Sequence, residues 1–250
     1  VLAAALEKFP GLRLAAISGG QFDNVICSRC DAVVALPTGS GAAFTAFIRE
    51  FDAALKNEYA VTDPGVTLTC AAAEAAKAVP AERTATLVQA LAAMPQGVEA
   101  MDTDFPGLVQ TSLNMGVVKL NGDGLHITFS IRSSIASRKL MLAQRVRAVA
   151  TLAGGTVAER GVYPGWQYKR ESKFRDTLLA AYKDLTGKDG VVEATHGGLE
   201  CGLLMEKIPG LDAVSMGPEL HDVHSVRERL NVPSTERTDE LVCELLRRSC

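Results

Sequence analysis

The chain has 250 residues, of which 47% are hydrophobic and 22% charged, and a formal net charge of −3 at pH 7. This composition is ordinary for a folded protein of one large or two modest domains. The dispersed Lys and Arg residues argue against nucleic acid as a partner, and no apolar run reaches the roughly 20 residues that a membrane-spanning helix needs.

Apolar spacing along the first 162 residues predicts helices and strands in alternation. Helices are expected at 2–9, at 41–59, from Pro80 onward, and from a cap at Ser137 to about residue 152. Strands are expected at 12–18, 24–36, 66–71, 108–118, 125–132 and 156–162. The turn signal Asn121-Gly122-Asp123-Gly124 predicts a hairpin between two of them. This order is a repeated split βαβ pattern, which predicts an α+β domain with one antiparallel sheet faced by helices.

Tyr163-Pro164-Gly165-Trp166 interrupts this pattern, so the domain boundary is predicted between residues 161 and 162. Beyond it, helices are expected at about 172–186, from near Leu199 and from Ser234. Strands are expected at 191–195 and 211–216. A strand–helix–strand order with flanking helices indicates a piece of a parallel α/β sheet.

The six cysteines have no framework spacing, which favours reduced thiols and a cytoplasmic protein. Cys27-Ser28-Arg29-Cys30 could be half of a zinc site or a redox pair. However, the chain has no second Cys-x-x-Cys, and in a strand these two thiols would point to opposite faces. We therefore interpret them as structural.

Two loops carry residues suited to chemistry. The first is His196-Gly197-Gly198-Leu199-Glu200-Cys201-Gly202, and the second runs from Gly217-Pro218 to His224-Ser225-Val226-Arg227-Glu228. A histidine on a Gly/Pro-bounded loop after a strand, with a Glu four residues later, has the chemistry of a metal ligand at the mouth of an α/β sheet. A loop histidine taken alone is more often simply exposed or hydrogen-bonded.

Together these loops resemble the end of the Xaa-His dipeptidases, the carnosinase-like aminoacyl-histidine dipeptidases among the di-zinc M20 peptidases. Further matches occur in the family's order at Gly19 to Ile26, at Ile131-Arg132-Ser133-Ser134 and at Tyr163 to Trp166. Leu-Glu-Cys in the Gly-Gly turn and Tyr-Pro-Gly-Trp favour the Xaa-His type over other M20 exopeptidases, such as aminoacylases or carboxypeptidases.

The resemblance implies a lid and dimerisation domain at 1–161 and the C-terminal part of an α/β catalytic domain at 162–250. The family's N-terminal His-x-Asp and Glu-Glu motifs are absent from this sequence, which opens in the middle of a helical pattern. We therefore expect the C-terminal portion of a dipeptidase, with the general base outside it and no activity in isolation. The alternative is a non-catalytic lid or dimerisation remnant.

The resemblance also assigns residues. It makes His224 a ligand of zinc in a two-metal site, with His221 as the local competitor, and it places substrate contacts on Asn24, Arg132 and Gly198. Without it, Arg132 would be a surface charge at a strand end and Asn24 a turn residue. We expect a dipeptide substrate and a homodimer through the lid, with neither nucleic acid nor membrane as a partner. Glu200 is expected to cap the helix that starts near Leu199 or to support a ligand, and His126 is expected to be structural. His196 is either a supporting partner or simply a histidine at a strand end.

Overall fold

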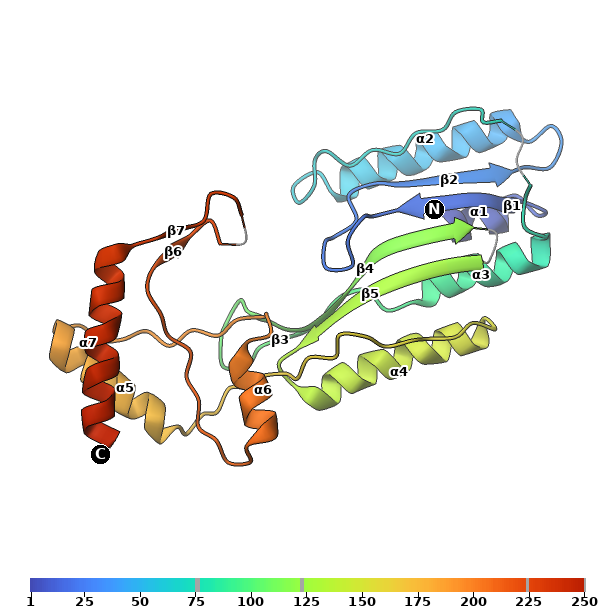
Figure 1. Cartoon of the computed structure of the whole chain (residues 1–250). Coiled ribbons are helices and arrows are strands. Elements are labelled where there is room, and N and C mark those ends of the chain that lie inside the picture. The colour runs from blue at the N-terminus through green and yellow to red at the C-terminus, as the bar shows by residue number, and fades with distance from the viewer. Residues whose placement is uncertain (75–76, 122–123, 224, 250) are drawn as a thin grey trace. The chain divides into compact units, whose positions relative to one another are not determined.

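The computed structural model describes residues 1–74, 77–121, 124–223 and 225–249 (Figure 1). They form two compact units. Unit 1 comprises Val1–Glu99, Ser112–Ile131 and Leu140–Glu159, and unit 2 comprises Ala100–Thr111, Arg132–Lys139 and Arg160–Cys250. Unit 2 therefore includes two segments that precede residue 162, and the domain boundary at residue 161 stays a prediction.

The elements follow the chain from α1 to α7. The helices are α1 (Leu2–Lys8), α2 (Gly41–Glu58), α3 (Ala81–Ala93), α4 (Ala136–Leu152), α5 (Lys173–Thr186), α6 (Glu200–Lys207) and α7 (Val232–Ser249). The strands are β1 (Arg13–Gly19), β2 (Cys30–Ala35), β3 (Gly97–Met101), β4 (Val109–Asn121), β5 (Gly124–Ser133), β6 (Leu220–His221) and β7 (Arg229–Leu230).

The main sheet has the strand order β2-β1-β4-β3, and β5 also pairs with β4. β1 runs antiparallel to β2, with Gly19 opposite Cys30, and antiparallel to β4, with Ser18 opposite Lys119. The predicted antiparallel sheet is confirmed. The predicted hairpin joins β4 and β5, although residues 122 and 123 of its turn lie outside the described residues.

Helices pack against this sheet through three apolar clusters of unit 1. In the first, Phe9 at the end of α1 meets Phe44 and Phe47 of α2, with ring centroids 5.3 and 5.7 Å apart in edge-on geometry. The other two join the sheet to α3 and α4 and are centred on Leu14, Ile17 and Val118 and on Leu113, Leu142 and Val146. The apolar spacing of α2 thus identified a true core face.

Several sequence expectations were wrong. Among the described residues, 66–71, 156–162, 191–195 and 211–216 are not strands, and β2 begins only at Cys30. A β-prone segment becomes a strand only where a neighbour completes its hydrogen-bond ladder, and apolar patterning does not reveal that neighbour. Ser137 lies inside α4 rather than at its cap, and β3, β6 and β7 were not predicted.

The described cysteines are free thiols, as expected. Cys27 precedes β2, so the argument from strand alternation does not apply to the Cys27–Cys30 pair. Burial raises the pKa of Cys30, and the neighbouring Cys27 and Asp31 raise it further, which favours the protonated thiol. In addition, no described helix is long and apolar enough to cross a bilayer.

Candidate functional site

Arg132 and His196 are neighbours in unit 2. Arg132 is the penultimate residue of β5 and is exposed. Burial lowers the pKa of His196, and the positive charge of Arg132 lowers it further, while a hydrogen bond with the backbone of Val109 opposes both effects. Because an ordinary histidine pKa is about 6.5, this imidazole is neutral at pH 7. The positive charge available to an anion at this point is therefore that of Arg132 alone, beside an uncharged imidazole whose N–H is used by the Val109 backbone.

Gly198 lies in the loop that leads into α6, directly against Tyr163. A Cβ at Gly198 would be 2.5 Å from Cδ1 of that ring, closer than a real Cβ contact can be. Burial raises the pKa of Tyr163, and the nearby Glu200 and Cys201 raise it further. The loop before α6 therefore needs a glycine at this position for space.

Glu200 is the first residue of α6, where a carboxylate favours the helix N-terminus. The N-cap position is occupied by Leu199, so Glu200 stands one residue inside the helix rather than at the cap. His126 is exposed on β5.

Asn24 is exposed on a loop of unit 1. Hydrogen bonds from β4 fix the backbone on both sides of it. The Nδ2 of Asn114 on β4 donates to the carbonyls of Asp23 (3.0 Å) and Val25 (2.7 Å), on either side of Asn24. Gly20 touches the same strand, since a Cβ there would be 1.8 Å from the carbonyl oxygen of Gly116. Asn24 thus belongs to unit 1, whereas Arg132 and Gly198 belong to unit 2.

His224, the predicted zinc ligand, lies outside the described residues. The hairpin around it is described. β6 and β7 pair antiparallel, and exposed His221 faces Arg229 across the pair. The carboxylate of Asp222, a residue with φ of +51°, forms an ion pair of 3.0 Å with Arg229.

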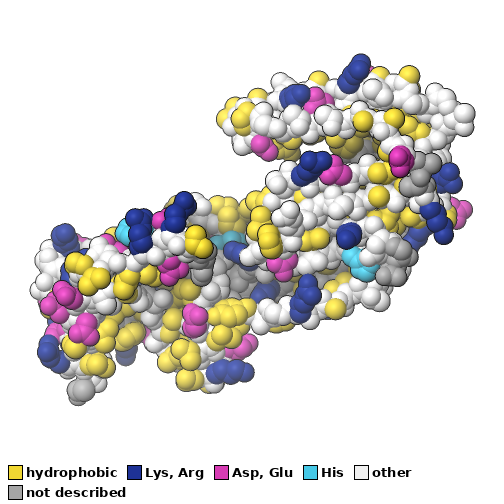
Figure 2. All heavy atoms as spheres, turned by 45° about the horizontal axis from the view of Figure 1, so that its top comes forward, with side chains coloured by type: hydrophobic (Ala, Val, Ile, Leu, Met, Phe, Trp, Pro, Cys, Tyr) yellow, Lys and Arg dark blue, Asp and Glu magenta, His cyan; other side chains and the backbone are white. Residues whose placement is uncertain are grey.

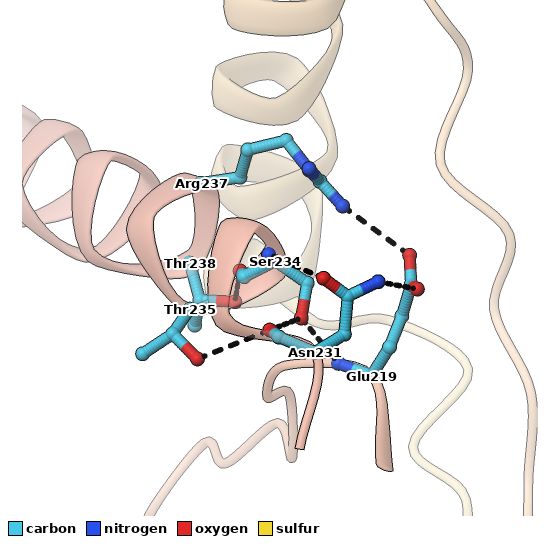
Figure 3. Close-up of polar contacts among 6 residues, drawn as sticks. All are labelled: Glu219, Asn231, Ser234, Thr235, Arg237 and Thr238. Carbon is cyan, nitrogen blue, oxygen red and sulfur yellow. Dashed lines mark hydrogen bonds and ion pairs between the residues drawn. The ribbon is translucent and has the colours of Figure 1, made fainter. Parts of the chain in front are cut away.

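A polar network closes the base of this hairpin (Figure 3). The Nδ2 of Asn231 donates to Oε2 of Glu219 (2.7 Å), and the backbone N–H of Asn231 donates to the Glu219 carbonyl (3.0 Å). Arg237 adds an ion pair of 3.3 Å to the same carboxylate. The Oγ of Ser234 accepts from the backbone N–H of Glu219 (2.9 Å).

The described residues do not make a metal site by themselves. Across 1–74, 77–121, 124–223 and 225–249, no group of three or more His, Cys, Asp or Glu side chains is arranged to hold a metal ion. A structural zinc site takes four ligands and a catalytic one three plus water. The predicted zinc site is therefore not assembled from the described part of this chain.

Unit 2 also contains an open polar cavity of about 430 Å³, which the sequence did not predict. Arg170 at its wall pairs with Asp104 at 2.8 Å, and Arg175 lies over the ring of Tyr168 at 4.9 Å. The lining residues are Asp102, Thr103, Asp104, Gln110, Ser134, Ile135, Gln167, Tyr168 and Arg170. The sequence feature nearest to this cavity is the motif Tyr163 to Trp166. The residues that directly follow it, Gln167 and Tyr168, line the cavity.

Known proteins match this chain both in sequence and in structure. Residues 2–63 match the model of the M20 peptidase dimerisation domain. The cytosol non-specific dipeptidase of Escherichia coli K12 is 31% identical over 237 residues, which are 94% of this chain and 49% of that protein. The crystal structure of aminoacylhistidine dipeptidase from Vibrio alginolyticus matches with a TM-score of 0.90 and 28% identity, covering 99% of this chain and 50% of that one. The chain thus spans about half the length of these relatives, and the resemblance to M20 dipeptidases is confirmed.

Proposed function

Starting from this relationship to the M20 dipeptidases, we propose that the complete protein hydrolyses Xaa-His dipeptides, including β-alanyl-histidine. The 250 residues supply its lid and dimerisation domain and the C-terminal part of its catalytic domain. The observation that carries the proposal is the match to two dipeptidases along nearly the whole chain, with Arg132 exposed at the end of β5 as a ligand for the substrate carboxylate. The name of the Vibrio relative supports the preference for histidine, and that of the Escherichia relative supports a cytoplasmic location.

The carboxylate of the dipeptide is the natural ligand for Arg132. A guanidinium binds a carboxylate through two parallel hydrogen bonds, each charge-assisted. The exposed loop at Gly198 offers backbone N–H groups to the same kind of anion. Asn24, in unit 1, is proposed as a further substrate contact because its segment matches the family's, and its firmly held loop suits that role.

We propose His224 as the zinc ligand that this chain contributes to a two-metal site. The remaining ligands and the general base then come from outside these 250 residues, because the described residues offer no group of three ligands. The isolated chain is accordingly expected to bind no stoichiometric zinc and to cleave no dipeptide.

The experiment compares the protein expressed from its complete coding sequence with its His224→Ala variant. Zinc content is measured by plasma mass spectrometry, and hydrolysis of β-alanyl-histidine on the same samples. We expect the variant to lose one metal ion and most activity, while the matched variant His221→Ala retains both. Full zinc occupancy and near-normal turnover in His224→Ala would overturn the assignment.

One observation favours a second candidate, a non-catalytic lid or dimerisation module. It is the lack of a three-ligand group within the part of the chain that the structure describes. The same measurements separate the candidates, because a non-catalytic module expressed from its complete coding sequence would contain no zinc and hydrolyse nothing. Hydrolysis of acylated amino acids or longer peptides in preference to Xaa-His dipeptides would instead indicate another M20 exopeptidase.

A further inference from the structure

The segment Tyr163–Trp166, here the YPGW segment, packs on one side against the end of β5. A Cβ at Gly165 would lie 2.6 Å from the carbonyl oxygen of Ser134 and 2.7 Å from that of Ser133. Real Cβ atoms do not approach so closely, so only glycine fits without moving the backbone. The two carbonyls immediately follow Arg132 in the chain.

On its other side, the YPGW segment packs against the Gly198 loop and α6. The ring of Tyr163 fills the place that a side chain at Gly198 would take, with Cδ1 at 2.5 Å and Cε1 at 2.7 Å from a Cβ there. One turn into α6, a Cβ at Gly202 would be 3.3 Å from Cβ of Trp166. Neither glycine has a positive φ, so backbone conformation does not explain them; close packing does.

A third contact holds the backbone of the segment. The ammonium of Lys139, near the start of α4, donates to the carbonyl oxygen of Tyr163. Burial lowers the pKa of Lys139, as expected for an ammonium inside a packed joint. The YPGW segment is thus fixed from three directions, all within unit 2.

We propose that the YPGW segment is a positioning element that sets the distance between Arg132 at the end of β5 and the backbone N–H groups at Gly198. The identity of the bound group, a dipeptide carboxylate, rests on the proposed function. A bidentate contact depends on placement, and misplacement by about 1 Å can cost roughly 100-fold in rate. Tyr163 and Gly165 therefore act on the substrate through Arg132 and Gly198 rather than by touching it.

The first test asks whether a disturbance on one side of the segment reaches the other side. Hydrogen exchange is measured by mass spectrometry on the protein from its complete coding sequence, following the amides of Ser134 and Ile135. These amides donate to the carbonyl of Gln110 (3.3 Å) and to Oγ of Ser133 (3.0 Å). We expect Gly198→Ala and Tyr163→Ala to accelerate their exchange, and Tyr163→Phe, which keeps the ring, to leave it unchanged.

The matched control is Gly41→Ala in α2 of unit 1, where an added Cβ meets no atom within 4 Å. The two sides of the segment are not coupled if the amides of Ser134 and Ile135 exchange at the same rate in Gly198→Ala and Tyr163→Ala as in Gly41→Ala. The proposal is then overturned, whether or not the protein is a dipeptidase.

The second test is kinetic and uses β-alanyl-histidine and its C-terminal amide. Gly198→Ala and Tyr163→Ala are expected to raise KM for the free acid on the order of tenfold or more, with a smaller change in kcat, and to reduce the preference for the acid over the amide. Arg132→Lys is the positive control. An active protein in which both variants match Tyr163→Phe would overturn the proposal. A protein that cleaves no dipeptide would instead contradict the proposed function, and the exchange result would then decide the coupling.

Discussion

His196 lies where two distant parts of the chain meet, Val109 at the start of β4 and Arg132 at the end of β5. Burial and the neighbouring guanidinium both oppose protonation of its imidazole. A neutral imidazole leaves the local positive charge to Arg132. At neutral pH this corner of unit 2 therefore suits a single carboxylate.

The lowered pKa of His196 has a consequence for stability. Its ordinary pKa is about 6.5, so between that value and the lower folded-state value the unfolded chain binds more protons than the folded one. The free energy of unfolding must then fall as the pH drops through this window, and it stays lowered below the folded-state pKa. We predict that His196→Gln, which does not titrate, loses less stability than the unsubstituted protein between pH 7.5 and 5.

Urea unfolding at a series of pH values measures this difference. Trp166, the single tryptophan of the chain, reports on unit 2 by fluorescence. His126→Gln is the matched control, since His126 is exposed on β5. Parallel pH profiles for His196→Gln and the unsubstituted protein would contradict the prediction.

Among the elements, the hairpin of β6 and β7 depends on side chains at its base rather than on its short ladder. Asn231 serves two purposes there: its Nδ2 clamps Glu219, and its Oδ1 accepts from the backbone N–H of Ser234 at 3.2 Å at the start of α7 (Figure 3). The second contact is an N-cap, of a type whose loss costs about 1 kcal/mol. One side chain thus joins the start of α7 to the hairpin that carries residue 224.

On the proposal that His224 binds zinc, we predict that Asn231→Ala weakens zinc binding in the complete protein by roughly 10-fold, because loss of its contacts to Glu219 and Ser234 loosens the hairpin that contains residue 224. Asn231→Ser separates the two roles, since it keeps a capping oxygen but lacks the amide donor to Glu219. It should unfold near the unsubstituted protein and still bind zinc more weakly. Competition with a chromophoric chelator measures the affinity, and unchanged zinc affinity in Asn231→Ser would count against the role of the clamp.

At the scale of the whole molecule, unit 2 exposes many apolar side chains among its charged ones (Figure 2). Val191 is 83% exposed, and Leu204 and Ile208 are each 50% exposed. Apolar surface that is exposed and contiguous is typical of interaction sites. The relatives are about twice as long as this chain, so we propose that the apolar surface of residues 162–250 contacts the rest of the catalytic domain.

We also predict that the protein is a homodimer through residues 1–161. Residues 2–63 match a dimerisation domain, and within them β2 ends the strand order of the main sheet, where an edge strand has unpaired backbone groups. Sedimentation equilibrium across micromolar concentrations is expected to give twice the chain mass. A monomer at every concentration would exclude the dimer.

Much of the fold was predictable from local signals in the sequence. The spacing of Phe44, Phe47 and Ile48 identified α2 and its buried face, and Ser172 marked the start of α5, where its side chain accepts from the N–H of Arg175. Helices follow such patterns because their hydrogen bonds and caps lie within one segment. The motifs around Arg132, Tyr163 and Gly198 likewise pointed to the family.

The strands and the arrangement of the site depended on the tertiary structure. Residues 191–195 resemble a strand in composition, but strand formation requires a partner ladder, which is why the expectation failed. The sequence placed Gly198 and Tyr163 in two motifs, but it did not reveal that the two residues pack together. It also did not reveal that the charge of Arg132 reaches His196. The sequence by itself thus determined the helices and the resemblance to the M20 dipeptidases. Only the tertiary structure decided which residues of the motifs meet, because contacts between distant segments depend on how the whole chain packs.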